Sequence, residues 1–400
     1  MGKLSITDLD VTGKRVLTRV DFNVPLDDGR VSDDTRLQAS LPTIQFILDQ
    51  GGTPVLMSHL GRPKGKVVAD MSLRPVADAL QLLLGRKVIL TPDCVGMETV
   101  VKNAPDGSVV LLENLRFHAE EEDNAPGFAK ALSEMGDVYV NDAFGTAHRA
   151  HASTEGVTHY FVDCAAGLLM QKELDYLGAA LSNPQRPFVA IMGGAKISGK
   201  IDVIENLFSK IDTLLIGGGM AFTFFKAMGL EIGKSLLEAD RIEIAANLLK
   251  RAKSEGVNLI LPVDTVVAGQ MAEGVPVQVV ASNQIPADQV GFDIGPQTAR
   301  LFAEEVQKAK TVVWNGPLGV CEIFSFSKGS RTVAEALAKA TKLGATTIVG
   351  GGETAAAVAD FGVADQLSHV STGGGASLEF LEGKTLPGVT ALSDKEDGGT

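Results

Sequence analysis

The chain alternates short apolar runs with longer amphipathic segments along most of its length. The apolar runs predict strands at residues 15–20, 55–57, 88–90, 109–112, 138–140, 188–192, 213–216, 259–261, 311–313, 347–349 and 367–370. Helical spacing predicts helices at residues 35–49, 73–84, 127–135, 201–211, 239–253, 298–309 and 332–341. This alternation predicts an α/β fold with two doubly wound, parallel-sheet domains of the Rossmann-like kind.

A single helix predicted at residues 168–181 separates the two halves. Pro184 and Pro187 end it. A chain of 400 residues is too long for one ordinary core. We therefore place an N-terminal domain at 1–170, a hinge helix and linker at 171–185, and a C-terminal domain at 186–385, and we expect the polar end 393–400 to be frayed.

The charge balance limits the partners. There are 36 Lys plus Arg against 49 Asp plus Glu, a formal net charge of −13, which argues against nonspecific nucleic-acid binding. The sequence lacks an apolar run typical of a signal peptide or a membrane span, so we expect a cytoplasmic protein. Cys94, Cys164 and Cys321 lack metal-ligand spacing and are predicted to be free thiols.

Polar and basic side chains follow the predicted strands of the first half. They are Asp21, Asn23, His59, Arg62, Arg116, Asn141, Asp142, His148 and Arg149, with Arg36 at the start of a helix and His151 further on. Arginine forms paired, charge-assisted hydrogen bonds with phosphate and carboxylate. Any one of these arginines could be an ordinary surface residue, but four at the strand ends of one sheet predict a small, highly anionic ligand.

Glycine-rich runs follow the strands of the second half. They begin at Gly193 (GGAKISGK), Gly217 (GGGMAF), Trp314 (WNGPLGV), Gly350 (GGGE) and Ser371 (STGGGAS). Such loops can direct several backbone N–H groups at a phosphate, although a single run could be only a tight turn. Gly194 to Lys200 fits seven positions of the phosphate-loop pattern, but Ile201 lacks the hydroxyl required at the eighth. The runs together predict a nucleotide site, and none matches the dinucleotide pattern G-x-G-x-x-G.

An anion site on one domain and a nucleotide site on the other are what phosphoryl transfer requires, because that chemistry relies on positioning and charge neutralisation. Transfer also requires water to be excluded, which predicts closure of the domains. Two alternatives remain open from the residues alone. One is a two-lobed binding protein that closes on an anion without chemistry, and the other is a scaffold for protein contacts.

Ordered motifs along the whole chain resemble the phosphoglycerate kinase family. They are RVLTRVDFNVP, SHLGRP, LLENLRF, NDAFGTAHRAHAS, GGAKISGKI, GGGMAFTFFKA, LPVD, WNGPLGVCE, GGGET and STGGGASLEFLEGKTLPGV. The resemblance implies reversible transfer of a phosphoryl group from 1,3-bisphosphoglycerate to ADP, giving ATP and 3-phosphoglycerate. It also implies Mg²⁺, a monomer, and a segment from about 386 to 400 that packs back on the first domain.

The resemblance also implies site residues, position by position. The phosphoglycerate side matches Asp21, Asn23, Arg36, His59, Arg62, Arg116 and Arg149. The nucleotide side matches Lys196, Lys200, Gly217, Gly218, Gly219, Asn315, Glu322, Gly350, Gly351, Gly352 and Glu353. The catalytic positions are Arg36, Lys196, Gly373 and Gly374, and Glu353 is implied as the Mg²⁺ carboxylate.

Two positions depart from the family's pattern. Glu353 stands where aspartate is usual, and its longer side chain could change the metal geometry. Gly199 stands where a polar or acidic residue is more usual, which could loosen the turn between Lys196 and Lys200. Neither change removes a charge that phosphoryl transfer needs.

Overall fold

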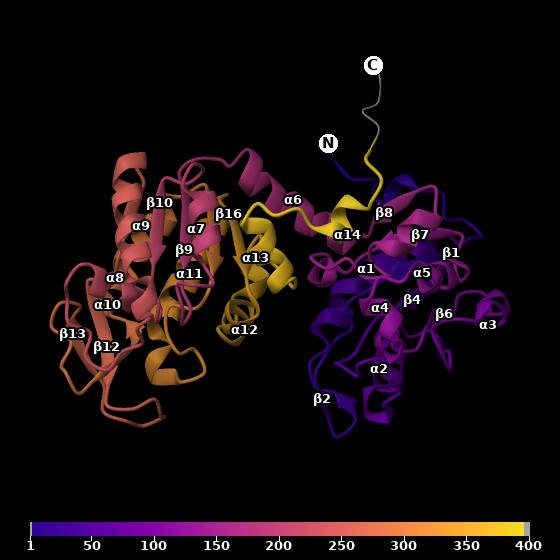
Figure 1. Cartoon of the computed structure of the whole chain (residues 1–400), viewed down its shortest axis with the longest axis horizontal. Coiled ribbons are helices and arrows are strands. Elements are labelled where there is room, and N and C mark those ends of the chain that lie inside the picture. The colour runs from indigo at the N-terminus through magenta and orange to yellow at the C-terminus, as the bar shows by residue number, and fades with distance from the viewer. Residues whose placement is uncertain (1, 396–400) are drawn as a thin grey trace, which may run out of the picture. The chain divides into compact units, whose positions relative to one another are not determined.

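The computed structural model describes residues 2–395, which form two compact units. The first unit comprises the described residues up to Asp175 together with those from Thr385 onward, and the second comprises Tyr176–Lys384. Helix α6 (Leu168–Ser182) carries the chain from the first unit into the second, as Figure 1 shows. The helix predicted at 168–181 is therefore present.

The first unit is built on a six-stranded parallel sheet with the order β5-β6-β4-β1-β7-β8. Its strands are β1 (Arg15–Arg19), β4 (Thr53–Met57), β5 (Val88–Leu90), β6 (Val109–Leu111), β7 (Val138–Asn141) and β8 (Cys164–Ala166). From β1 the chain passes to β4 and then to β5 at the edge, returns to place β6 between those two, and then crosses to β7 and β8 on the other side of β1, so the winding reverses between β1 and β7. Ligands of open parallel sheets bind beyond the strand ends at such a point.

Helices cover this sheet. They are α1 (Thr35–Asp49), α2 (Arg74–Leu84), α3 (Glu98–Lys102), α4 (Ala119–Glu122), α5 (Pro126–Ser133) and α14 (Pro387–Thr390). Ile44 of α1 and Leu80 of α2 belong to one buried cluster with Leu56 and Leu111 of the sheet. Each fully buried side chain of this size stabilises the fold by about 1.5–3 kcal/mol. Helix α2 ends at Gly85, whose left-handed backbone at φ 61° lets its N–H bond to the last turn.

The second unit is built on another six-stranded parallel sheet with the order β11-β10-β9-β15-β16-β17. Its strands are β9 (Phe188–Met192), β10 (Thr213–Ile216), β11 (Asn258–Ile260), β15 (Thr311–Asn315), β16 (Thr346–Gly350) and β17 (His369–Val370). Numbered within the sheet, this is the 3-2-1-4-5-6 order of dinucleotide-binding folds. The winding reverses between β9 and β15. Both sheets confirm the predicted α/β class.

The helices of the second unit bury a core around this sheet. They are α7 (Ile201–Leu207), α8 (Ala221–Ala227), α9 (Ile242–Glu255), α10 (Pro296–Lys308), α11 (Lys328–Lys342), α12 (Gly352–Asp360) and α13 (Gly375–Leu381). Phe302 of α10 and Leu337 of α11 share one buried cluster with Val312 and Trp314 of β15. Among residues 2–395, no helix is long and apolar enough to cross a membrane.

The sequence did not predict two antiparallel elements. One is a three-stranded sheet of β12 (Asp264–Ala268), β13 (Gln278–Ala281) and β14 (Val290–Ile294) in the order β13-β12-β14, and the other is the hairpin of β2 (Leu26–Asp27) and β3 (Arg30–Val31). Strand β13 is mostly exposed, and each hairpin strand has two residues. Strand β13 and the hairpin therefore contain no buried apolar run that a pattern search would detect, whereas β12 is buried throughout and was missed although it contains the apolar run 266–268.

Asp142, which follows β7, caps the N-terminus of α6. Its Oδ1 accepts the N–H groups of Leu169 at 2.9 Å and Met170 at 3.1 Å. The hydroxyl of Thr43 accepts the N–H of Leu168 at 2.9 Å. Burial raises the pKa of Asp142 from 3.8 to about 7, although its hydrogen bonds act in the opposite direction. Asp142 therefore serves the helix and not the strand-end ligand site.

The described end of the chain is attached to the first unit. Gly388 N–H donates to Ala147 O at 2.8 Å, Ser393 N–H donates to Cys164 O at 2.9 Å, and Lys395 Nζ donates to Asp8 Oδ1 at 2.8 Å. The fraying predicted for 393–400 is therefore wrong for 393–395, because backbone pairing and ion pairs hold this stretch. The other residues of that prediction, 396–400, lie outside the described residues.

We predict that Asp142→Asn changes how stability depends on pH. The folded state raises this pKa, so the group's favourable contribution is complete below about pH 4 and is lost as the pH rises through about 7. Asparagine keeps an oxygen for the two N–H groups and does not ionise. When the pH is raised from 5 to 8, the unfolding free energy of Asp142→Asn should therefore increase by about 1–3 kcal/mol relative to that of the unchanged chain.

Urea unfolding of both proteins at the two pH values measures this difference. Asp142→Ala is the control, because it removes the cap and should destabilise the fold by about 1 kcal/mol or more at both pH values. Parallel pH dependence of Asp142→Asn and the unchanged chain would contradict the prediction.

Candidate active site

Three strand-end loops of the first unit are tied together by predicted site residues. Arg36, near the start of α1, pairs with Asp21 at 2.8 Å between Nη1 and Oδ2. Asn23 Oδ1 accepts the N–H of Gly61 at 2.9 Å, and Arg116 Nη1 donates to the carbonyl of Gly61 at 2.9 Å. The loops after β1, β4 and β6 therefore share one network at the carboxyl edge of the sheet.

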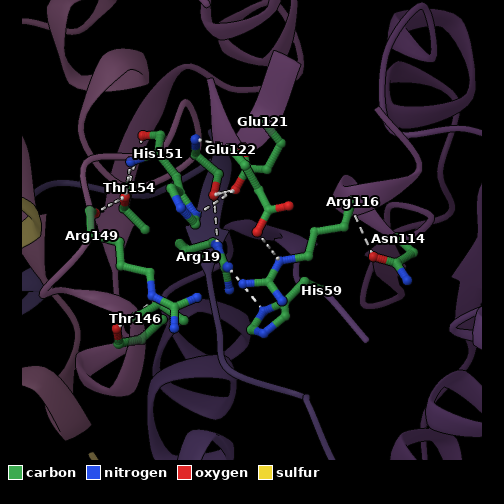
Figure 2. A network of polar contacts seen from close by, with 12 residues as sticks. Arg19, His59, Asn114, Arg116, Glu121, Glu122, Thr146, Arg149, His151 and Thr154 are labelled. Atoms are coloured by element: carbon green, nitrogen blue, oxygen red, sulfur yellow. Dashed lines mark hydrogen bonds and ion pairs between the residues drawn. The ribbon is translucent and has the colours of Figure 1, made fainter. Parts of the chain in front are cut away.

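A buried arginine that the sequence reading missed lies behind these loops. Arg19, the last residue of β1, is 1% exposed. Its Nε donates to Ser153 Oγ at 2.8 Å, and its Nη2 lies 3.2 Å from His59 Nδ1 (Figure 2). Ser153 in turn donates through Oγ and N–H to Glu121 at 2.5 and 2.9 Å. Arg19 and Glu121 are therefore joined through one serine.

Burial and the arginines set the protonation of this cluster. Burial lowers the pKa of His59 well below 6.5, and Arg19 and Arg116 lower it further. Burial and the same arginines lower the pKa of His151 to about 4. Burial raises the pKa of Glu121, whereas Arg19 and the bonds from Ser153 lower it. Both histidines are therefore neutral near pH 7, and the arginines supply the positive charge.

The other arginines at this edge of the sheet are Arg116, Arg149 and Arg62. Figure 2 shows the guanidinium groups of Arg19, Arg116 and Arg149 pointing toward one another. Arg149 is exposed, and its Nε donates to His148 Nε2 at 3.2 Å. Arg62 is exposed on the loop after β4. The structure thus brings Arg116 and Arg149 together and leaves Arg62 at the surface of the same edge.

Glycine loops of the second unit pack backbone against backbone at the point where the winding reverses. Gly194 N–H donates to Pro317 O at 2.7 Å. Gly316 has φ 93°, and an added Cβ there would lie 2.2 Å from Gly193 O. An added Cβ on Gly218, at φ 66°, would lie 2.7 Å from Gly194 N. No side chain fits at these positions, so the loops after β9, β10 and β15 need glycine for their own packing.

Gly217 and Gly219, the other two predicted glycines in the loop after β10, are packed in the same way. An added Cβ would lie 2.6 Å from Leu318 Cδ2 at Gly217 and 2.9 Å from Ala195 O at Gly219. A role in nucleotide binding stays a prediction for all three glycines. Their packing gives each of them a structural reason that does not depend on a ligand.

Lys200 and Asn315 form the polar centre of this region. Lys200 Nζ donates to Asn315 Oδ1. Burial lowers the pKa of Lys200, whereas the carboxylates of Glu353 and Glu382 raise it. The amide Nδ2 of Asn315 is buried and has no hydrogen-bond partner among residues 2–395, and an added Cβ on Gly350 would lie 3.3 Å from it. An unsatisfied donor beside a glycine loop suits an oxygen atom of a ligand.

The other predicted residues of the second unit border this centre or lie exposed. Gly351 is the N-cap of α12, Gly352 is its first residue, and Glu353 lies in its first turn with an exposed side chain. Gly373 N–H donates to Ser371 Oγ at 3.1 Å, and Gly374, at φ 50°, precedes α13. Lys196 and Glu322 are exposed.

The residues present fit Mg²⁺. This ion is commonly held by one or two carboxylates together with substrate phosphates. Glu353 offers one such carboxylate, and it acts electrostatically on Lys200. The exposed side chain leaves room for both the ion and a phosphate.

The fold and these two regions define a class of protein. It is an α/β protein of two compact units, with arginines at the strand ends of one parallel sheet and glycine-rich loops at those of the other. Comparisons with known proteins identify the family. The phosphoglycerate kinase family model matches residues 6–384.

Individual phosphoglycerate kinases are similar to this chain along nearly its whole length. A phosphoglycerate kinase of Chloroherpeton thalassium is 59% identical over 398 residues, covering 98% of this chain and 100% of that protein. The solved structure of phosphoglycerate kinase from Coxiella burnetii has 43% identity and a TM-score of 0.88, with 98% of each chain covered. That from Pyrococcus horikoshii has 32% identity and a TM-score of 0.84, covering 97% of this chain and 98% of the other.

The chain therefore belongs to the phosphoglycerate kinase family. It is an enzyme, a phosphotransferase that moves a phosphoryl group between 1,3-bisphosphoglycerate and ADP, and its role is in glycolysis. ATP and ADP are its co-substrates. This activity decides against a binding protein without chemistry as its main function.

We predict that Arg19 and Glu121 are energetically coupled. Arg19→Met leaves a buried carboxylate without its nearby positive charge, and should lower the unfolding free energy by about 3–5 kcal/mol. Glu121→Gln removes that charge, so it should cost less in the Arg19→Met background than alone. The coupling from a double-mutant cycle should be about 1 kcal/mol or more.

Urea unfolding of the four proteins gives the coupling. Arg62→Met is the matched control, because this exposed arginine should change stability by no more than about 0.5 kcal/mol. Additive effects of Arg19→Met and Glu121→Gln would show that the two groups are not coupled.

Proposed function

We propose that the first unit binds the phosphoglycerate substrate and that the second binds the nucleotide together with Mg²⁺. The observation that carries this assignment is the separation of residue types. Arginines lie at the strand ends of the first sheet, whereas glycine loops with one partly buried lysine, Lys200, lie at those of the second. Guanidinium groups suit a compact acid with several negative charges, and glycine loops suit a nucleotide's phosphates.

On the phosphoglycerate side, the proposed ligands are Asp21, Asn23, Arg36, His59, Arg62, Arg116 and Arg149. Asn23 and Arg116 both form hydrogen bonds with the backbone of Gly61, which supports a preorganised site. Asp21 holds Arg36 by an ion pair. A neutral His59 can donate a hydrogen bond to a substrate oxygen or accept one from a substrate hydroxyl.

On the nucleotide side, the proposed ligands are Lys196, Lys200, Gly217, Gly218, Gly219, Asn315, Glu322, Gly350, Gly351, Gly352 and Glu353. The unsatisfied Nδ2 of Asn315 supports this choice, because a nucleotide oxygen would complete its bonding. Glu353 is the proposed carboxylate for Mg²⁺. The bound ion would neutralise charge on the nucleotide phosphates.

The transfer step needs charge neutralisation and no proton transfer. A terminal oxygen of ADP forms the new bond to phosphorus while the bond between phosphorus and the acyl oxygen breaks. The acceptor oxygen and the released carboxylate are both anionic, so neither must lose or gain a proton. Neutral histidines and a set of arginines agree with this requirement.

Arg36, Lys196, Gly373 and Gly374 are the proposed groups at the transferred phosphoryl. The two side chains would stabilise its developing negative charge, and the two glycines would offer backbone N–H groups. Direct transfer also requires the two ligands to meet with water excluded. We therefore propose that the units close on each other during turnover.

Two further parts of the proposal concern the enzyme in its cell. The three cysteines are free thiols, which is consistent with a reducing compartment, and we propose the cytoplasm. We also propose that the enzyme acts as a monomer, because each proposed site is built from one chain.

Steady-state kinetics of two variants tests the assignment. Lys196→Ala should mainly lower kcat, by about 10²–10³-fold as for a lost transition-state donor. Arg62→Ala should mainly raise the KM for 1,3-bisphosphoglycerate and leave the KM for ADP unchanged. The assay follows ATP formation from 1,3-bisphosphoglycerate and ADP.

A metal control accompanies the assay, since turnover should be lost on chelation and restored by Mg²⁺. If Lys196→Ala and Arg62→Ala raised the same KM to the same extent, these roles would be wrong.

A further inference from the structure

We propose that Asp93, Cys94 and His118 form a binding site in the first unit for one cation of the Zn²⁺ class. The fold brings a carboxylate oxygen, a thiol sulfur and an imidazole nitrogen within 4.8 Å of one another. None of the three belongs to the phosphoglycerate or nucleotide residues proposed above. The site would be additional to that of the catalytic Mg²⁺.

Two segments that are distant in the sequence form this cluster. Asp93 and Cys94 lie in the loop after β5, and His118 precedes α4. His118 Nε2 lies 2.7 Å from Asp93 Oδ1, and the N–H of Cys94 donates to the same oxygen at 2.6 Å. Thr91 also holds the loop, because its hydroxyl donates to Asp93 O at 2.5 Å. The ligand atoms are therefore already held close together.

The distances suit a tetrahedral cation. With metal–ligand bonds of about 2.0–2.3 Å, neighbouring ligand atoms around Zn²⁺ lie roughly 3.5 Å apart. Side-chain shifts of about an ångström are sufficient to reach this geometry. Asp93 could bind the cation through Oδ2 while Oδ1 keeps the backbone bond to Cys94.

The donor set selects the metal. Sulfur and nitrogen ligands favour Zn²⁺ or Co²⁺, whereas Mg²⁺ and Ca²⁺ prefer oxygen alone. Three protein ligands and a water molecule would complete four-coordination. The side chains of Asp93 and His118 are 45% and 28% exposed, so the cation has a path from solvent on their side.

A nucleophilic triad is the other chemistry that these three residue types suggest, and the structure argues against it. Cys94 is fully buried, so a substrate molecule cannot pack against its sulfur, whereas a single cation can approach it past the partly exposed Asp93 and His118. Burial raises the pKa of this thiol well above 9, with Asp93 and Glu121 adding to the effect. A metal cation, by contrast, displaces the thiol proton on binding, and that proton leaves to water.

Titration of the full chain with Co²⁺ tests the proposal. We expect one Co²⁺ per chain and a thiolate-to-cobalt charge-transfer absorption, which Zn²⁺ abolishes by competition. Cys94→Ser should remove this absorption. His118→Gln and Asp93→Asn should each weaken Co²⁺ binding by roughly tenfold or more. Cys321→Ser is the matched control and should retain both the absorption and the affinity.

Kinase activity and circular dichroism of each variant show whether it is folded. If Cys94→Ser fails to fold, the partly exposed ligands Asp93 and His118 still give a test through their own variants. Two results would overturn the proposal. One is the absence of a thiolate absorption in the unchanged chain, and the other is Co²⁺ affinity that His118→Gln and Asp93→Asn leave unchanged.

Discussion

Parallel pairing of strands is the constraint on which both units depend. It places the carboxyl ends of neighbouring strands at one edge of a sheet, so the loops that follow them become neighbours. In the first unit this brings together the residues after β1, β4 and β6, which Gly61 links by hydrogen bonds. In the second it brings together the loops after β9, β10 and β15, which are so close that only glycine fits at Gly193 and Gly316.

Several arginines lie at the carboxyl edge of the first unit's sheet, where their positive charges repel one another. A buried carboxylate offsets this repulsion. Arg19 is buried and lies near Arg116, so each disfavours the other's charge. Glu121 is joined to Arg19 through Ser153 and supplies the opposite charge. Burial, together with the same arginines, lowers the pKa of His59 and of His151 and keeps both side chains neutral near pH 7. Such a site neutralises an anion well and moves protons poorly, which is what phosphoryl transfer between two anionic oxygens requires.

The sequence predicts those parts of the fold that rest on local pattern. Strands β5, β9 and β10 have the predicted bounds. Strands β9 and β10 are buried throughout, and strands buried on both faces read as continuous apolar runs. The short hairpin and exposed β13 were missed because they bury no such run. The strand-end rule predicted that Asp21, Arg36 and Arg116 would lie at one edge of the sheet, and it needs only the order of strands along the chain; their roles in binding stay predictions.

Features that depend on distant partners were not predicted. Arg19 reads as part of an apolar strand, and its partner Ser153 is 134 residues away. Asp142 was read as a strand-end residue, but the start of α6 returns to its carboxylate. Cys94 has no metal-ligand spacing in the sequence, and only the fold brings His118 beside it.

Hydrogen exchange with each ligand alone tests the division of ligands between the two units most directly. The account predicts that 3-phosphoglycerate slows amide exchange in the first unit, around residues 20–24, 59–62 and 114–118. It predicts that Mg²⁺ with ATP slows exchange in the second, around residues 193–200, 315–318 and 350–354. Protection of the same unit by both ligands, or the reverse assignment, would contradict it.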